Sequence, residues 1–190
     1  MDRKELKSRI IRIRNYLLSA HVTIPSGSGL DNALREAEAF ADSIKSTHPP
    51  TNENVLFTAL ASHLAWNLAD ILDACSHAGL DFAPHLQRMK IGSVDFGTPA
   101  LSNRYIYFKD FEFELFVTSG LLQQTLNVAV QSASNDPRFD VKADGIRIEA
   151  KHPNSKKKMS EYIGDFQGEL EKANTYGFLA TALEDACNMG

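Results

Sequence analysis

Apolar residues in the first part of the chain recur every three or four positions, the spacing of one face of an α-helix. The first such run covers residues 6–18, and the proline and glycine residues of segment 24–29 interrupt it. A second run covers residues 31–44. A third covers residues 55–72, with Gly79 as its expected C-terminal stop. The pattern therefore predicts three amphipathic helices.

The pattern becomes irregular over residues 83–103, where prolines and glycines are frequent, and we expect a connector there. A further helix is predicted over residues 111–126, with Asp110 as its N-cap. The stretch 128–132 that follows, which begins with three apolar residues, predicts a strand. We place the boundary between a helical region and a second region inside this connector.

The remainder of the chain alternates strand and helix signals. Residues 134–137 are typical of a turn, and residues 138–151 have the alternation of a β-hairpin. Residues 155–173 are compatible with a helix. Residues 176–183 fit either a strand or more helix, and the glycine within them favours the strand. The fold class is therefore α/β (α+β), with a helical region over residues 1–103 and an α/β region over residues 104–190.

Composition narrows the class of protein further. The 190 residues are 43% apolar and 23% charged, as in ordinary globular domains. Cys75 and Cys187 are far apart and lack metal-ligand spacing, so neither a disulfide framework nor a zinc ribbon is indicated. No run of apolar residues approaches the roughly 20 that a membrane span needs. We expect a cytoplasmic protein with no membrane partner.

Charge is distributed unevenly along the chain. The formal net charge of −4 argues against a protein that coats nucleic acid through bulk charge. Residues 138–158 nevertheless carry seven basic and three acidic side chains, a net charge of +4. Lys156, Lys157 and Lys158 close this basic segment, where they either contact phosphates or form a solvated charge run.

The hairpin within this segment brings chemical groups together. Asp144-Gly145 is a preferred two-residue turn because both positions tolerate positive φ. Counting outward from that turn pairs Asp140 with Glu149 across the two strands. Alternation along the strand then places Lys151 on the same face as Glu149. Two carboxylates and an amine are therefore expected to meet, unless the hairpin is simply a solvated strand pair.

Two carboxylates this close repel each other unless a cation lies between them. Hard ions such as Mg²⁺ or Mn²⁺ prefer carboxylate, carbonyl and phosphate oxygens. We predict that Asp140, Glu149 and the carbonyl of Ala150 bind this metal, with Lys151 as the catalytic cation. These groups suit phosphodiester hydrolysis, and the number of metal ions stays open.

Asp140, followed after eight residues by Glu149-Ala-Lys151, resembles the motif of the PD-(D/E)xK, or restriction-endonuclease-like, nuclease superfamily. The resemblance covers about residues 104–190. It implies a mixed sheet flanked by helices, and a helix before the motif that supplies another glutamate to the catalytic and metal-binding groups. Glu114, between Phe113 and Leu115, is the candidate, with Glu112 as the alternative.

Two hypotheses of function follow. The first is a metal-dependent nuclease, most simply a DNA endonuclease of restriction, phage-defence or repair type, with a homodimer or a larger complex as a possible assembly. The second is a noncatalytic nuclease-like module for binding or assembly. DNA and RNA substrates, and endonuclease and exonuclease modes, are not distinguished by the sequence.

Overall fold

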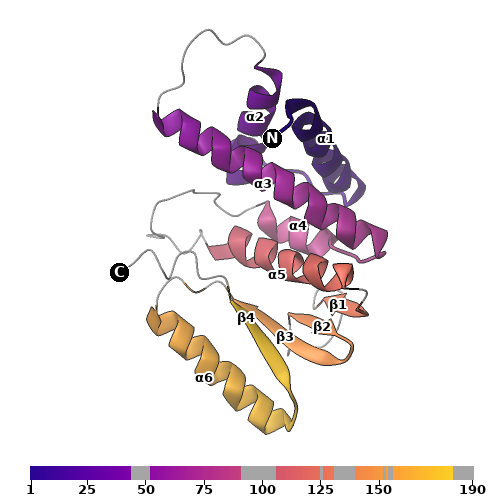
Figure 1. Ribbon diagram of the computed structural model, residues 1–190, viewed down its shortest axis with the longest axis vertical. Helices are drawn as coiled ribbons and strands as arrows, with labels where there is room; N and C mark the ends of the chain where they lie inside the picture. Colours follow the sequence, from indigo (N-terminus) through magenta and orange to yellow (C-terminus); the bar gives the residue numbers. More distant parts are fainter. Residues whose placement is uncertain are drawn as a thin grey trace.

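The computed structural model describes most of the chain as a mixed α/β protein (Figure 1). Within the described part, six helices accompany a four-stranded sheet that contains antiparallel and parallel strand pairs. This confirms the expected α/β class with a mixed sheet. The described residues are 1–43, 52–90, 106–124, 126–130, 140–151, 153 and 156–181.

The first three helices form a bundle. They are α1 (Arg3–Ser19), α2 (Gly29–Asp42) and α3 (Asn52–His77), which pack against one another. Helices α1 and α3 extend beyond their apolar runs at both ends, whereas α2 begins before its run but ends at Asp42, short of the predicted end at residue 44. Capping residues begin a helix before its buried face does; Asp2, for example, accepts a hydrogen bond from the backbone N–H of Lys4 at 2.9 Å. The apolar faces meet in one core that includes Leu6, Ile10, Ile13, Leu30, Leu34, Leu68 and Leu72.

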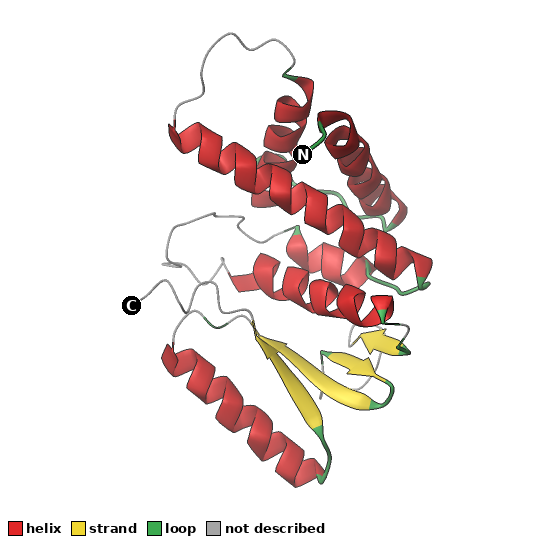
Figure 2. Ribbon diagram, viewed as in Figure 1, coloured by secondary structure: helices red, strands yellow, loops and turns green. Residues whose placement is uncertain are grey.

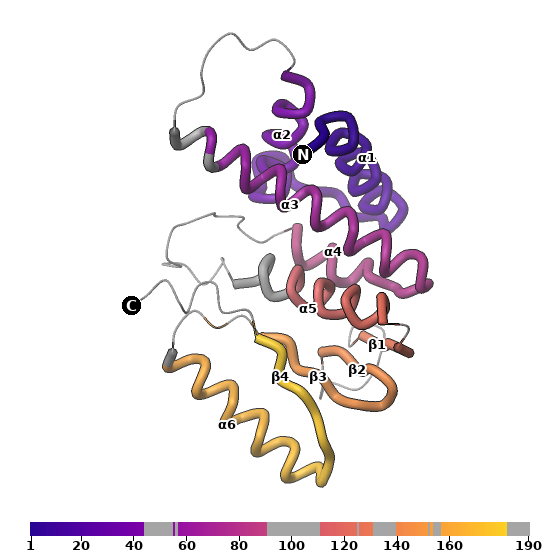
Figure 3. The backbone as a smooth tube through the Cα atoms, viewed as in Figure 1, coloured from indigo at the N-terminus to yellow at the C-terminus, as the bar shows by residue number. Residues whose placement is uncertain are grey.

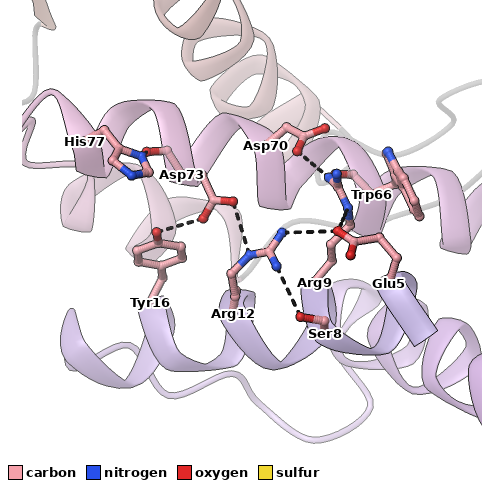
Figure 4. Close-up of polar contacts among 9 residues, drawn as sticks. All are labelled: Glu5, Ser8, Arg9, Arg12, Tyr16, Trp66, Asp70, Asp73 and His77. Atoms are coloured by element: carbon pink, nitrogen blue, oxygen red, sulfur yellow. Dashed lines mark hydrogen bonds and ion pairs between the residues drawn. The ribbon is translucent and has the colours of Figure 1, made fainter. Parts of the chain in front are cut away.

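Polar side chains join α1 to α3 beside that core (Figure 4). Arg9 pairs with Asp70 and lies over the ring of Trp66, with 4.0 Å between its guanidinium carbon and the ring centroid. The Tyr16 hydroxyl donates to Asp73 at 2.8 Å. Partly exposed pairs of this kind contribute roughly 0.2–1 kcal/mol each, so they align the two helices more than they stabilise them.

Helix α4 (Ala83–Met89) lies where the sequence predicted the start of a connector, so that prediction was wrong there. Pro84 is compatible with the helix because N–H groups in the first turn have no acceptor within the helix. Leu86 and Met89 are buried, and α4 packs against the next helix. Seven residues are too few for the helical period to be recognised. The rest of the expected connector, residues 91–103, lies outside the described residues.

Helix α5 (Ile106–Gln123) lies between the helical bundle and the sheet (Figure 3). It begins before Asp110, so the prediction of Asp110 as N-cap was wrong. Packing on both sides of α5 outweighs the weak local preference of an aspartate for a cap. Phe111 and Leu115 join the bundle core, whereas Leu121 packs against the core beneath the sheet. The two predicted regions therefore share this helix.

The sheet has the order β1-β2-β3-β4 (Figure 2). Its strands are β1 (Val128–Val130), β2 (Val141–Ala143), β3 (Ile146–Lys151) and β4 (Gly177–Thr181). The first three pair antiparallel, and β4 pairs parallel with β3. The strand expected after α5 is confirmed at β1. Residues 131–139, including the expected turn, lie outside the described residues.

The β2–β3 hairpin has the predicted turn and register. Asp144 and Gly145 have φ angles of 47° and 85°, as a two-residue turn of this type requires. The turn is also held by Asn127, whose backbone N–H donates to the Asp144 carboxylate at 3.0 Å. The pairs across the strands are those counted from the turn: Val141 with Ile148, Lys142 with Arg147, and Ala143 with Ile146.

Helix α6 (Lys156–Ala173) connects β3 to β4, which confirms the expected helix and the expected strand after it. Arg147 on β3 pairs with Glu169 of α6. Gly177 allows β4 to lie close to β3 and α6, because a Cβ at this position would lie 2.8 Å from the Arg147 carbonyl oxygen and 2.9 Å from the Phe166 ring. None of the described helices is long and apolar enough to cross a membrane.

Candidate active site

The β2–β3 hairpin positions the three motif side chains. Asp140 immediately precedes β2, and Glu149 and Lys151 occupy alternate positions of β3. The residues between and before them, Ala150 and Ile148, are buried. Because successive side chains of a strand point to opposite faces, burial of one set leaves Glu149 and Lys151 together on the other face.

Contacts among the three side chains are direct. The Lys151 ammonium donates to Asp140 Oδ2 at 2.9 Å and lies 3.7 Å from Glu149 Oε1. The backbone N–H of Ala150 donates to the same Asp140 oxygen at 2.9 Å. The Asp140 side chain is 10% exposed and the Lys151 side chain is 29% exposed, so Lys151 is the more accessible of the two. The structure thus brings together the aspartate, glutamate and lysine that were predicted from the sequence.

Glu149 lies in an unfavourable electrostatic environment for a carboxylate. Burial, followed by the negative charge of Asp140, raises its pKa from 4.5 to about 7, even though Lys151 acts in the opposite direction. Its Oε2 atom is buried and has no hydrogen-bond partner among the described residues. A buried oxygen without a donor is destabilising, and so are two adjacent carboxylates. A positive charge placed between Glu149 and Asp140 would stabilise the buried oxygen and offset the repulsion between the two carboxylates.

The electrostatic environment of Lys151 favours its charged form, unlike that of Glu149. Burial by itself lowers its pKa, but the charge and hydrogen bond of Asp140, with the charges of Glu149 and Glu114, outweigh burial and raise the pKa above 10.5. The side chain is therefore an ammonium at neutral pH. In this state Lys151 can donate hydrogen bonds and attract anions, but it cannot accept a proton.

Glu114 lies on α5, the helix that packs against β3, and its carboxylate contacts α4. Its Oε2 lies 3.1 Å from Nε2 of His85 on α4. Glu114 contributes to the raised pKa of Lys151 through its charge, and the choice of Glu114 over Glu112 stays a prediction. His85 was missed by the sequence analysis, because a single histidine in a segment without clear periodicity gives no signal.

The three lysines at 156–158 begin α6. Lys158 pairs with Glu161 at 2.9 Å and lies 5.1 Å from the centroid of the Tyr162 ring, so it has partners within its own helix. Lys157 is exposed. Positive charges in the first turn oppose the helix dipole, so this position does not favour helix stability. Their contact with nucleic acid stays a prediction.

No protein-family model matches this chain, and neither a curated protein nor a solved structure matches it significantly. Within the described ranges, no group of three or more histidine, cysteine, aspartate or glutamate side chains is arranged to bind a metal ion. Asp140 and Glu149 are therefore the two carboxylates that the structure brings together. Mg²⁺ commonly binds one or two carboxylates and completes its coordination with water and substrate phosphate.

Proposed function

We propose that this chain is a metal-dependent nuclease that hydrolyses phosphodiester bonds, with a core of the restriction-endonuclease-like type. The expected substrate is DNA, and the expected mode is an endonuclease of restriction, phage-defence or repair type. One observation carries the proposal: Lys151 lies 2.9 Å from Asp140, just before β2, and 3.7 Å from Glu149 on its own strand, β3. Two carboxylates beside an ammonium form a site for a metal and a phosphate.

The donor atoms at this site fit a hard divalent cation. Among the described residues Glu149 has a buried oxygen without a hydrogen-bond partner, and burial and Asp140 raise its pKa, so a metal ion bound there would stabilise its carboxylate. Asp140, Glu149 and the Ala150 carbonyl would bind Mg²⁺ or Mn²⁺, with Glu114 as the further acidic group. Such an ion, when bound, lowers the pKa of water and stabilises charge on the phosphate.

The protein side chains have separate roles in this proposal. Lys151 is held by Asp140 in its ammonium form, so it attracts the phosphate and offsets the negative charge that develops during hydrolysis. Asp140 is itself oriented by the Ala150 N–H. Because two donors fix Asp140, its carboxylate needs little reorganisation when substrate arrives.

In this proposal the lysines at residues 156–158 attract the nucleic acid substrate. Lys156 and Lys157 begin the helix that follows β3, so they lie a few residues beyond Lys151 along the chain. Lysines near a nuclease site contribute sequence-independent attraction to phosphates and make binding sensitive to salt. Lys158 would have to exchange its pairing with Glu161 for such a contact.

The proposal is tested by incubating supercoiled plasmid DNA with the protein and Mg²⁺ or Mn²⁺, with EDTA as the metal-free control. We expect Asp140→Asn, Glu149→Gln and Lys151→Met each to reduce cleavage at least about 100-fold, the order found when one transition-state contact is removed. Lys172→Met, an exposed lysine at the other end of α6, is the matched control and should cleave normally. Equal cleavage by all five proteins would refute the proposal.

The second hypothesis, a noncatalytic module, is separated by calorimetric titration with Mn²⁺. A nuclease binds the ion, and Asp140→Asn weakens that binding, whereas a binding module has no need for a divalent site. A parallel assay with single-stranded RNA determines which nucleic acid is cleaved.

A further inference from the structure

His85 is a buried histidine that the roles assigned so far do not use. It lies on α4, which packs against α5, and its side chain is only 2% exposed. Its Nε2 is 3.1 Å from Glu114 Oε2 on α5, and its ring meets that of Phe111 edge to face at 6.0 Å between centroids. The orientation of the imidazole is therefore determined by both the hydrogen bond and the ring contact.

Glu114 is the acceptor in this contact, and it belongs to the helix that packs against β3. Its side chain is 12% exposed, so most of the solvent that would otherwise hydrate the carboxylate is excluded. A glutamate has several rotatable bonds, and a directional hydrogen bond removes much of that freedom. Its charge also acts on Lys151, which places the carboxylate within electrostatic reach of the site.

We propose that His85 is a positioning residue, whose Nε2–H donates to Glu114 and fixes that carboxylate on the helix that packs against β3. The inference rests on the proposed nuclease function, and it makes the helical bundle part of the active site. Removal of a group that hydrogen-bonds to a metal ligand and orients it typically lowers metal affinity or activity by about 10- to 100-fold.

The test measures Mn²⁺ affinity by calorimetry and plasmid cleavage for the full chain and its variants. We expect His85→Leu to weaken Mn²⁺ binding about 10- to 100-fold. His85→Gln, whose amide N–H can take the place of Nε2–H, should restore most of the affinity. In a Glu114→Gln background, His85→Leu should have little further effect, because the histidine acts through that carboxylate. A merely structural role predicts additive losses instead.

Circular dichroism establishes that each variant is folded, and His63→Gln, an exposed histidine on α3, is the matched control. Should His85→Leu not fold, His85→Gln is compared with His85→Asn, whose shorter amide cannot reach the Nε2 position. Equal affinity of these two would then overturn the inference.

These measurements distinguish a failure of the role proposed for His85 from a failure of the proposed nuclease function. Loss of cleavage and Mn²⁺ binding in Asp140→Asn, with both unchanged in His85→Leu, overturns the role of His85 alone. Absence of Mn²⁺ binding and cleavage in the unmodified chain overturns the proposed function, and with it this inference.

Discussion

Replacement of Glu149 by glutamine is expected to stabilise the metal-free protein while it abolishes cleavage. The Glu149 carboxyl has its pKa raised from 4.5 to about 7, first by burial and then by Asp140. The folded state therefore holds this proton more tightly than the unfolded chain does. Each pH unit between the two values corresponds to about 1.4 kcal/mol, so the full difference approaches about 3 kcal/mol.

The sign of the effect follows from proton binding. Below pH 4.5 the carboxyl is protonated in both states, and the unmodified chain and Glu149→Gln should be similarly stable. As the pH rises toward 7, the unfolded carboxyl ionises first, so the free energy of unfolding of the unmodified chain falls relative to the variant. Above pH 7 the gap should stay constant, at up to about 3 kcal/mol.

Urea denaturation monitored by circular dichroism in EDTA, from pH 4 to pH 8, measures this gap. The difference at pH 8 corresponds to a melting temperature higher by roughly 5 to 10 °C in the variant. Mg²⁺ should narrow the gap at pH 8, because an ion that binds only the folded unmodified chain stabilises it by about 2.7 kcal/mol at 100 times its Kd.

A matched control separates this site from other titrating groups. Glu171 is an exposed glutamate near the end of α6, and Glu171→Gln, which leaves the hairpin intact, should change stability little. The electrostatic reasoning is refuted if the gap between Glu149→Gln and the unmodified chain does not grow between pH 4.5 and 7. A gap that Mg²⁺ leaves unchanged would argue against the metal site itself.

The remaining predictions concern the packing of two glycines and the reactivity of a buried thiol. Gly177→Ala should destabilise the protein by about 1–3 kcal/mol in urea denaturation, because the added methyl group overlaps the Arg147 carbonyl and the Phe166 ring. Gly168→Ala, where a Cβ meets nothing within 4 Å on α6, should instead stabilise the helix by up to about 1 kcal/mol, and a loss in both variants would contradict this account. Cys75 is buried and burial raises its pKa to about 12, so in a Cys187→Ser background a thiol reagent should modify it only after unfolding; fast labelling of the native protein would refute its inert state.

Local sequence signals anticipated much of the fold. The turn at Asp144 and Gly145 set the register of the hairpin, since positive φ at both positions selects this turn and two-residue alternation assigns the faces. The helical period likewise identified the buried faces of α1 to α3. Local rules were insufficient for α4 and for the start of α5, where a short helix and an internal aspartate depend on packing with neighbouring helices.

By itself, then, the sequence determined that Asp140, Glu149 and Lys151 meet on one hairpin, because turn chemistry and strand alternation act over only a few residues. Tertiary structure alone decided how deeply Glu149 is buried and which group pairs with Glu114. His85 and Glu114 are 29 positions apart and become neighbours only when α4 packs against α5. Burial and long-range partners depend on how complete faces of helices and sheets fit together, and no short sequence pattern contains that information.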